Sequence, residues 1–290
     1  MIHLRKCSCR YFSHIFTGNL LVVPEQYAIS NTAKKVQRLT YRNEPIKISH
    51  SEGILEMKGF QNSSIDINSS DSVQLDNIIG SKISIISGKC ISKKSFSGSG
   101  SIKSGEVSFN NLIADDMTLT EIKSAALDSY YVKNLLIKSN LPEVDLSIGA
   151  GHGNTTIHFE ETSNVKFDHF ENGSLVIKQK LGELNLGLGD TIKDLELTMG
   201  EGTMSISITN PMALTDLRIK CSELVISDDI KCFIRDQNLV EMPEYVEFSG
   251  SIGSNESSDE NLWTINLMRG KVELSLKSSW INSVKSKLNL

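Results

Sequence analysis

Two His-x-Glu triplets have the spacing in this sequence that best fits a metal site, His158-Phe-Glu160 and His169-Phe-Glu171. Residues i and i+2 of a β-strand point to the same side, so each histidine is expected beside its own glutamate. If the two strands stacked, two imidazoles and two carboxylates would converge, and such a set can bind zinc. The alternative is an exposed polar surface with the phenylalanines turned inward. We favour the polar surface and predict no metal, with His158, Glu160, His169 and Glu171 as the residues of the metal alternative.

Three glycine pairs are candidates for a phosphate-binding site, because glycine-rich loops can cradle a phosphate. The pattern Leu-x-(Ile/Leu/Met)-Gly-x-Gly occurs at Leu146–Gly151, Leu184–Gly189 and Leu197–Gly202. A dinucleotide loop needs its glycines to open a helix whose N-terminus meets the phosphate. Here Gly202 is followed by the alternating run Met204–Ile208, which predicts another strand. We therefore interpret the pairs as turns and predict no cofactor.

Catalytic arrangements of other kinds are not indicated. None of the six histidines lies in a nucleophile context such as G-x-S-x-G. The acid pairs Asp115-Asp116 and Asp228-Asp229 are adjacent residues, which face opposite ways on a strand, so we predict turns at both. The sequence therefore predicts no catalytic residue and a protein that is not an enzyme.

The first 42 residues differ in composition from the rest of the chain. Arg5, Lys6 and Arg10 precede the first acidic residue, Glu25, and hydroxyl residues lie among them. A basic, acid-free, Ser-containing segment is typical of a mitochondrial transit peptide, so we predict a targeting leader or flexible N-terminus over 1–42 and a mitochondrial location. A cytoplasmic location and, through the short apolar run 16–23, secretion are the alternatives. The possible zinc set His3, Cys7, Cys9 and His14 matches no structural zinc spacing.

Composition excludes several classes of partner. The chain has a net charge of −5 and 6% aromatic residues, and only three arginines follow Arg42. A nucleic-acid binder normally shows a basic stripe with stacking aromatics, so no nucleic acid is expected. No apolar run is long enough to span a membrane.

The five cysteines are odd in number and loosely spaced, although Cys221 and Cys232 could pair across adjacent strands.

The body of the chain alternates apolar and polar residues in short runs. Examples are Val144–Ile148, Met204–Ile208 and Val272–Leu276, and the gaps between runs hold Gly, Asn, Asp and Ser. Period two with β-branched residues predicts strands, and these gap residues are typical of turns. Degenerate short repeats, such as Ile-Lys-Ser at Ile102, Ile122 and Ile137, recur over this region. Together they predict an all-β fold, a single-stranded β-solenoid over 43–278, with a pair of β-sandwiches as the alternative.

In the last residues of the sequence the apolar side chains recur at helical spacing, not at the strand spacing of two. Within 279–290, four apolar residues fall at about helical spacing with Lys285 and Lys287 on the other side, and these four are Trp280, Ile281, Val284 and Leu288. The spacing predicts a short amphipathic helix. We expect it to cap the stack of strands, and contact with a membrane surface or a partner is the alternative.

The strand and corner pattern resembles a known family. The segment Ser-Gly-Glu-Val-Ser-Phe at 104–109 and the three glycine-paired corners look like the adhesin-type β-solenoid domain, a domain of unknown function found widely in bacteria. A eukaryotic family of similar layout carries this domain behind a mitochondrial-type leader. The resemblance covers about residues 46–276. It implies the solenoid fold and an interaction role, and it carries over no catalytic residue.

These observations lead to two function classes. The first is a non-enzymatic scaffold that presents its coil surfaces to a protein partner. The alternative is a carbohydrate-binding or carbohydrate-active protein, which rests on fold analogy alone.

Overall fold

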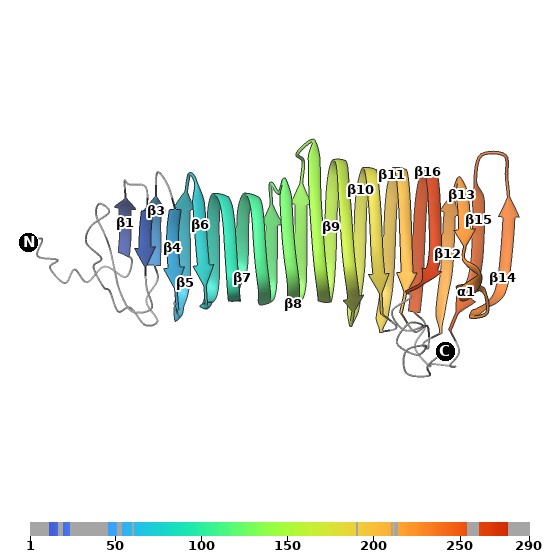
Figure 1. Cartoon of the computed structure of the whole chain (residues 1–290), viewed down its shortest axis with the longest axis horizontal. Coiled ribbons are helices and arrows are strands. Elements are labelled where there is room, and N and C mark those ends of the chain that lie inside the picture. Colours follow the sequence, from blue (N-terminus) through green and yellow to red (C-terminus); the bar gives the residue numbers. More distant parts are fainter. Residues whose placement is uncertain are drawn as a thin grey trace, which may run out of the picture. The chain divides into compact units, whose positions relative to one another are not determined.

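The structure is a computed structural model that describes residues 12–16, 20–23, 46–50, 54–59, 61–189, 191–209, 211, 214–253 and 261–277. In this part of the chain nearly every residue belongs to a strand, and the strands stack as successive coils (Figure 1). The prediction of an all-β solenoid is therefore confirmed.

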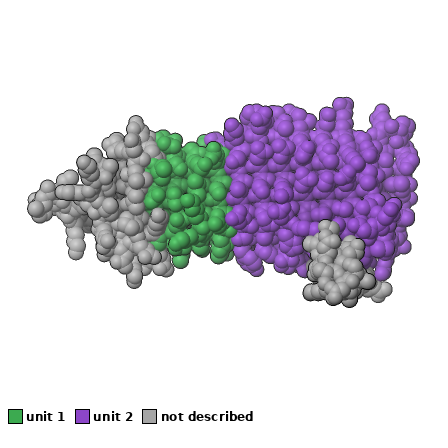
Figure 2. Space-filling model, in the orientation of Figure 1, with its two compact units in different colours: residues 1–120 green, residues 121–290 purple. Residues whose placement is uncertain are grey.

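The chain divides into two compact units, residues 1–120 and 121–290, which Figure 2 colours separately. The strands of the first unit are β1 Phe12–Phe16, β2 Leu20–Val23, β3 Ile46–His50, β4 Ile54–Lys58, β5 Gln61–Ser69, β6 Ser72–Asp76 and β7 Ile78–Thr120. The elements of the second unit are β8 Ser124–Ser139, β9 Glu143–Glu171, β10 Gly173–Leu188, β11 Ile192–Ile208, β12 Thr215–Cys221, β13 Glu223–Ile226, α1 Asp228–Lys231, β14 Ile234–Glu241, β15 Val246–Ile252 and β16 Asn261–Leu276.

Coils stack in parallel so that equivalent residues form columns along each unit. In the second unit one fully buried column runs through β8, β9, β10, β11, β16 and β12 as Ile137, Ile157, Ile177, Leu197, Ile265 and Ile219. Residues on either side of such a column point outward, which is why the sequence alternates. Each column buries apolar side chains at about 25 cal/mol per Å², so the continuous core is what holds the stack together.

Coil length differs between the units and explains why the repeats are irregular. Side chains that hydrogen-bond across neighbouring coils are 17 residues apart in the first unit, as for Ser87 and Ser104. From β8 to β11 in the second unit several such pairs are 19 or 20 residues apart, as for Asn164 with Asp145 and Asn154 with Asn134. Leu146 and Leu184 begin two of the three glycine motifs, and they lie in one column on either side of Val165. Leu197, which begins the third motif, lies in the column of Ile177 on the other side of the coil.

A column of glycines forms one corner of the coils in the second unit. Gly182, Gly202 and Gly270 are register partners, and each has a positive φ, of 124°, 143° and 131°. A Cβ on Gly202 would lie 1.9 Å from the carbonyl oxygen of Gly182, so no side chain fits. The chain continues past Gly202 as β11, without a helix. The interpretation of this pair as a coil corner is confirmed.

The second unit closes with an unusual strand order. The C-terminal strand β16 lies between β11 and β12 and pairs in parallel with both (Figure 1). Beyond β12 the sheet becomes antiparallel, in the order β12, β15, β14. Ile230 of α1 and Phe248 and Ile252 of β15 are buried at this end of the core. The strand β14 is the last of the sheet among the described residues.

Both predicted terminal segments lie at the limits of the described chain. Within 1–42 the structure describes two strands, β1, which pairs in parallel with β3, and β2, which pairs in parallel with β4. The predicted helix with Trp280, Ile281, Val284 and Leu288 lies outside the described residues, so it stays a prediction. Over the described part of the chain, no helix is long and apolar enough to cross a membrane.

Candidate functional site

The two His-x-Glu triplets lie on different sides of the coil. His158 stacks between Lys138 and Lys178 of the neighbouring coils, with its side chain and that of Glu160 exposed. His169 follows half a coil later and faces another surface. The four side chains of the metal alternative therefore do not converge. Phe159 and Phe170 both point into the core, as expected for the polar-surface interpretation.

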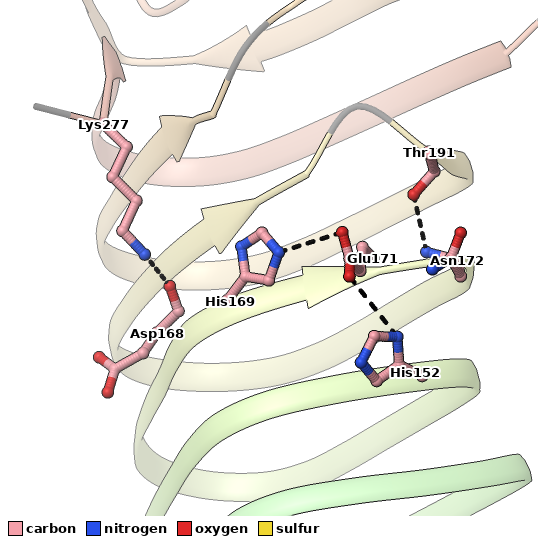
Figure 3. Close-up of polar contacts among 7 residues, drawn as sticks. All are labelled: His152, Asp168, His169, Glu171, Asn172, Thr191 and Lys277. Carbon is pink, nitrogen blue, oxygen red and sulfur yellow. Dashed lines mark hydrogen bonds and ion pairs between the residues drawn. The ribbon is translucent and has the colours of Figure 1, made fainter. Parts of the chain in front are cut away.

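A different histidine joins the second triplet. The Nε2 atom of His169 lies 3.2 Å from one carboxylate oxygen of Glu171, as i and i+2 spacing predicts. The Nδ1 atom of His152 lies 3.9 Å from the other oxygen, within ion-pair range but too far for a hydrogen bond (Figure 3). That nitrogen is buried and has no hydrogen-bond partner among the described residues. The ring of Tyr131 covers His152 at 5.3 Å between ring centres.

This cluster stabilises a coil edge and supplies no metal centre. Over the described ranges, no group of three or more His, Cys, Asp or Glu side chains is placed to hold a metal ion. The neighbouring contacts also join coils. The N–H of Asn172 donates to the hydroxyl of Thr191 at 3.1 Å, and the ammonium group of Lys277, which follows β16, donates to the carbonyl of Asp168 in β9 (Figure 3). The carboxylate of Glu171 thus lies between two imidazoles, 3.2 Å from His169 and 3.9 Å from His152.

The acid pairs differ in structure. Asp115 and Asp116 lie in β7, and the N–H groups of both donate to the hydroxyl of Ser99. Asp228 and Asp229 begin the one-turn helix α1, so the predicted turn was wrong there. Their position suits them because acidic residues in a first turn are stabilised by the helix dipole. Lys231 pairs with Asp228 at 2.7 Å and lowers the pKa of that carboxyl.

The cysteines described are all free. Cys90 and Cys221 are buried, whereas Cys232 is exposed, so the conceivable pair Cys221–Cys232 is not formed. Burial raises the pKa of Cys90 to about 12 and that of Cys221 to about 11. Neither thiol is a nucleophile at neutral pH, because the thiolate is the reactive form.

Two shallow depressions lie on the outer surfaces of the second unit. One, of about 280 Å³, is lined by polar and apolar residues of β8, β9 and β10. Three of its polar residues already have partners: Asn164 donates to Asp145 at 3.0 Å, and Lys166 pairs at 3.0 Å with Asp168, which lies outside the depression.

The second depression, which we call the trough, has about 330 Å³ and crosses β16, β12, β15 and β14. Two rows of register partners line it. The first row is Thr264, Arg218, Ser249 and Asn238, and the second is Asn266, Lys220, Glu247 and Val240.

The two cations of the trough are in different states. Lys220 pairs with Glu247 at 2.7 Å, and its Nζ atom lies 3.9 Å from the ring centre of Tyr245. Hydrogen bonding to Glu247 raises the pKa of Lys220. Arg218 is exposed, and in the described part of the chain it has no ion pair. Its register neighbours are the neutral Thr264 and Ser249.

Three exposed apolar residues lie near the trough, on β14 and directly after it. Leu239 is 52% exposed, Val240 36% and Met242 48%, and we call these three the apolar rim. Val240 lines the trough, whereas the adjacent Leu239 points to the opposite face of the sheet, beside its register partner Phe248. No further strand among those described covers Leu239. The rim and trough together form a surface that combines exposed apolar groups with a cation for which no ion pair is found among the described residues.

Sequence reasoning missed both rim and trough. The segment 234–242 holds no motif, and its side chains come together with Arg218 only through the antiparallel pairing of β15. The scarcity of arginine after Arg42 was the available signal, because it leaves Arg218 as one of only three candidates.

Comparison of the chain with family models, with curated proteins and with solved structures finds no match.

Proposed function

We propose that the protein is a non-enzymatic interaction protein, a mitochondrial scaffold that binds a protein partner through the apolar rim and trough. The observation that carries the proposal is the exposure of apolar residues on both faces of the last described strand of the sheet and directly after it, namely Leu239, Val240 and Met242. Sheet ends with exposed apolar residues are costly to leave open, because they invite pairing with other chains. A cluster of this kind on a folded protein is typical of a binding site.

The composition of this surface supports a protein partner. Methionine, arginine and tyrosine are enriched in protein interfaces, and Met242, Arg218 and Tyr245 all lie here. The backbone of β14 offers an edge to which an extended segment could add as a strand. The bulge in β14 between Arg235 and Asn238, where Asp236 has a φ of 51°, limits that edge to its last four residues. Side-chain contacts, more than strand addition, should therefore supply the affinity.

The mitochondrial part of the proposal rests on the basic, acid-free start of the sequence, with Arg5, Lys6 and Arg10. A mitochondrial location limits the partner to a protein of that organelle. A role like that of the adhesin-type domains is part of the same proposal, since it too is binding without catalysis.

Affinity capture with matched variants tests the proposal. The tagged chain is expressed in cells, mitochondria are isolated, and bound proteins are quantified for the unaltered chain and for the double variant Leu239→Arg with Met242→Arg. The control is Met268→Arg, because Met268 is 79% exposed on β16 and lies outside the trough.

We expect at least one protein to be bound by the unaltered chain and by the Met268→Arg variant and to be lost from the rim variant. Circular dichroism and melting of all three proteins verify that they are folded. A set of bound proteins that is the same for all three would contradict the proposal.

A further inference from the structure

The charge balance of the trough points to the chemistry of its partner. The outward side chains of β12 are Asp216, Arg218 and Lys220. Glu247 is already paired with Lys220, and Asp216 lies two residues before Arg218 without an ion pair to it. Arg218 therefore presents a guanidinium group, flanked by the hydroxyls of Thr264 and Ser249, to whatever enters the trough.

We propose that the trough recognises a carboxylate side chain in an acidic segment of the protein partner, held by Arg218. This inference rests on the proposed function and names the chemistry of its partner. A guanidinium group binds a carboxylate through two parallel hydrogen bonds, which gives specificity as well as affinity. Asn238 and Asn266 add amide groups at the two ends of the rows, where they can bond the backbone of such a segment.

An acidic peptide fits the trough better than an acidic polysaccharide. Sugar rings bind largely by stacking on aromatic faces, and the trough offers none. The side chain of Phe248 is 3% exposed, and the ring of Tyr245 is covered by the ammonium group of Lys220. The exposed apolar groups near the trough are instead Val240, which lines it, and Met242, two residues later in the chain, and these suit leucine-like side chains flanking an acidic residue.

Direct binding to defined probes tests this. A short fluorescent peptide of alternating glutamate and leucine is titrated with the full-length chain, and binding is followed by anisotropy. The same peptide with glutamine in place of glutamate measures the contribution of charge. Variant Arg218→Ala is compared with Arg269→Ala, which removes an exposed arginine outside the trough and so matches the change in net charge.

We expect Arg218→Ala to weaken glutamate-peptide binding about tenfold or more, and Arg269→Ala to leave it within about twofold. Arg218→Lys should fall between them, because it keeps the charge and loses the paired hydrogen bonds. Equal losses for both alanine variants, or equal affinity for the glutamine peptide, would overturn the proposal. Binding of hyaluronate that depends on Arg218, with no peptide binding, would also overturn it and assign the trough to a carboxylated polysaccharide.

The experiments distinguish failure of the carboxylate proposal from failure of the proposed function. If a captured partner is lost with the rim variant and retained with Arg218→Ala, the scaffold proposal stands and the carboxylate inference fails. The opposite result is that binding of the glutamate peptide depends on Arg218 while the captured proteins are the same for the rim variant and the unaltered chain. In that case the trough binds acidic segments but the rim is not the partner surface, and the scaffold proposal fails.

Discussion

Lys277, at the end of β16, donates from its ammonium group to the backbone carbonyl of Asp168, 109 residues earlier. Its own N–H donates to the carbonyl of Ile208 at 2.9 Å, at the end of β11. The end of the last strand is therefore bonded to two earlier coils. Because β16 lies between β11 and β12, the coil formed by β12 and β13 depends on a strand that comes later in the chain.

The inserted strand should account for a large share of the stability of the second unit. Trp263 on β16 is 2% exposed and stacks between Leu195 of β11 and Leu217 of β12. We expect Trp263→Ala to lower the free energy of unfolding by about 3–5 kcal/mol, measured by urea denaturation. The neighbouring Leu262, which is 36% exposed, supplies the control, and Leu262→Ala should cost under about 1 kcal/mol. Similar losses for the two variants would show that β16 is not packed as described.

The glycine corner should be intolerant of any side chain. Gly202→Ala would place a Cβ 1.9 Å from the carbonyl oxygen of Gly182 at a φ of 143°. Strain at such a position costs about 1–3 kcal/mol before the clash is counted, so we expect at least that loss in urea unfolding. Gly105→Ala is the control, since the nearest atom to its Cβ would be the carbonyl oxygen of Gly88 at 3.3 Å. If Gly202→Ala and Gly105→Ala lowered the free energy of unfolding equally, Gly202 would not be a corner of the coil.

Cysteine labelling reports on burial in the two units separately. In a variant with serine at positions 7 and 9, a maleimide at neutral pH should modify one thiol, that of the exposed Cys232. Cys90 and Cys221 should react only after denaturation, because burial keeps them inaccessible and protonated. Mass spectrometry of the labelled protein counts the adducts. Rapid modification of Cys90 would mean that the coils of the first unit open readily.

The raised pKa of Cys90 also predicts a loss of stability in alkali. Burial raises this pKa from its ordinary value of 9.0 to about 12, so folding favours the protonated thiol. The resulting stabilisation is complete below about pH 9 and is lost as the pH rises toward about 12. Melting temperature followed over this range should fall less steeply for Cys90→Ala than for the unaltered chain. Parallel curves would show that Cys90 does not contribute to the pH dependence.

The predicted leader and the first strands share residues, and this has a measurable consequence. If residues up to about position 42 are removed on import, β1 and β2 leave with them, and β3 and β4 lose their parallel partners. We expect faster amide hydrogen exchange in β3 and β4 of a chain starting at residue 43 than in the full-length chain. Intact mass of the protein from the mitochondrial fraction establishes which form is present there. A full-length mass in that fraction would contradict the leader prediction.

Sequence alone predicted the fold, because the alternation of apolar and polar residues and the glycine corners depend on neighbours in the chain. It also predicted the contact of His169 with Glu171, which needs only i and i+2 geometry. It could not predict that His152 lies within ion-pair range of Glu171, since the coil length that brings His152 near Glu171 is not fixed by any local signal. The same limit applies to the trough, where Arg218 and Asn238 meet through β15, and to the insertion of β16 between β11 and β12.

The most direct test of the account is site-specific photocrosslinking in intact cells. A photoreactive amino acid replaces Val240, which lies in both the trough and the apolar rim, and in a second protein it replaces the exposed Met268 of β16. We predict a discrete crosslinked band from position 240 that is absent from position 268 and that disappears with Arg218→Ala. No crosslinked partner from position 240, with the protein folded and present in the cell, would contradict the claim that this surface binds a protein.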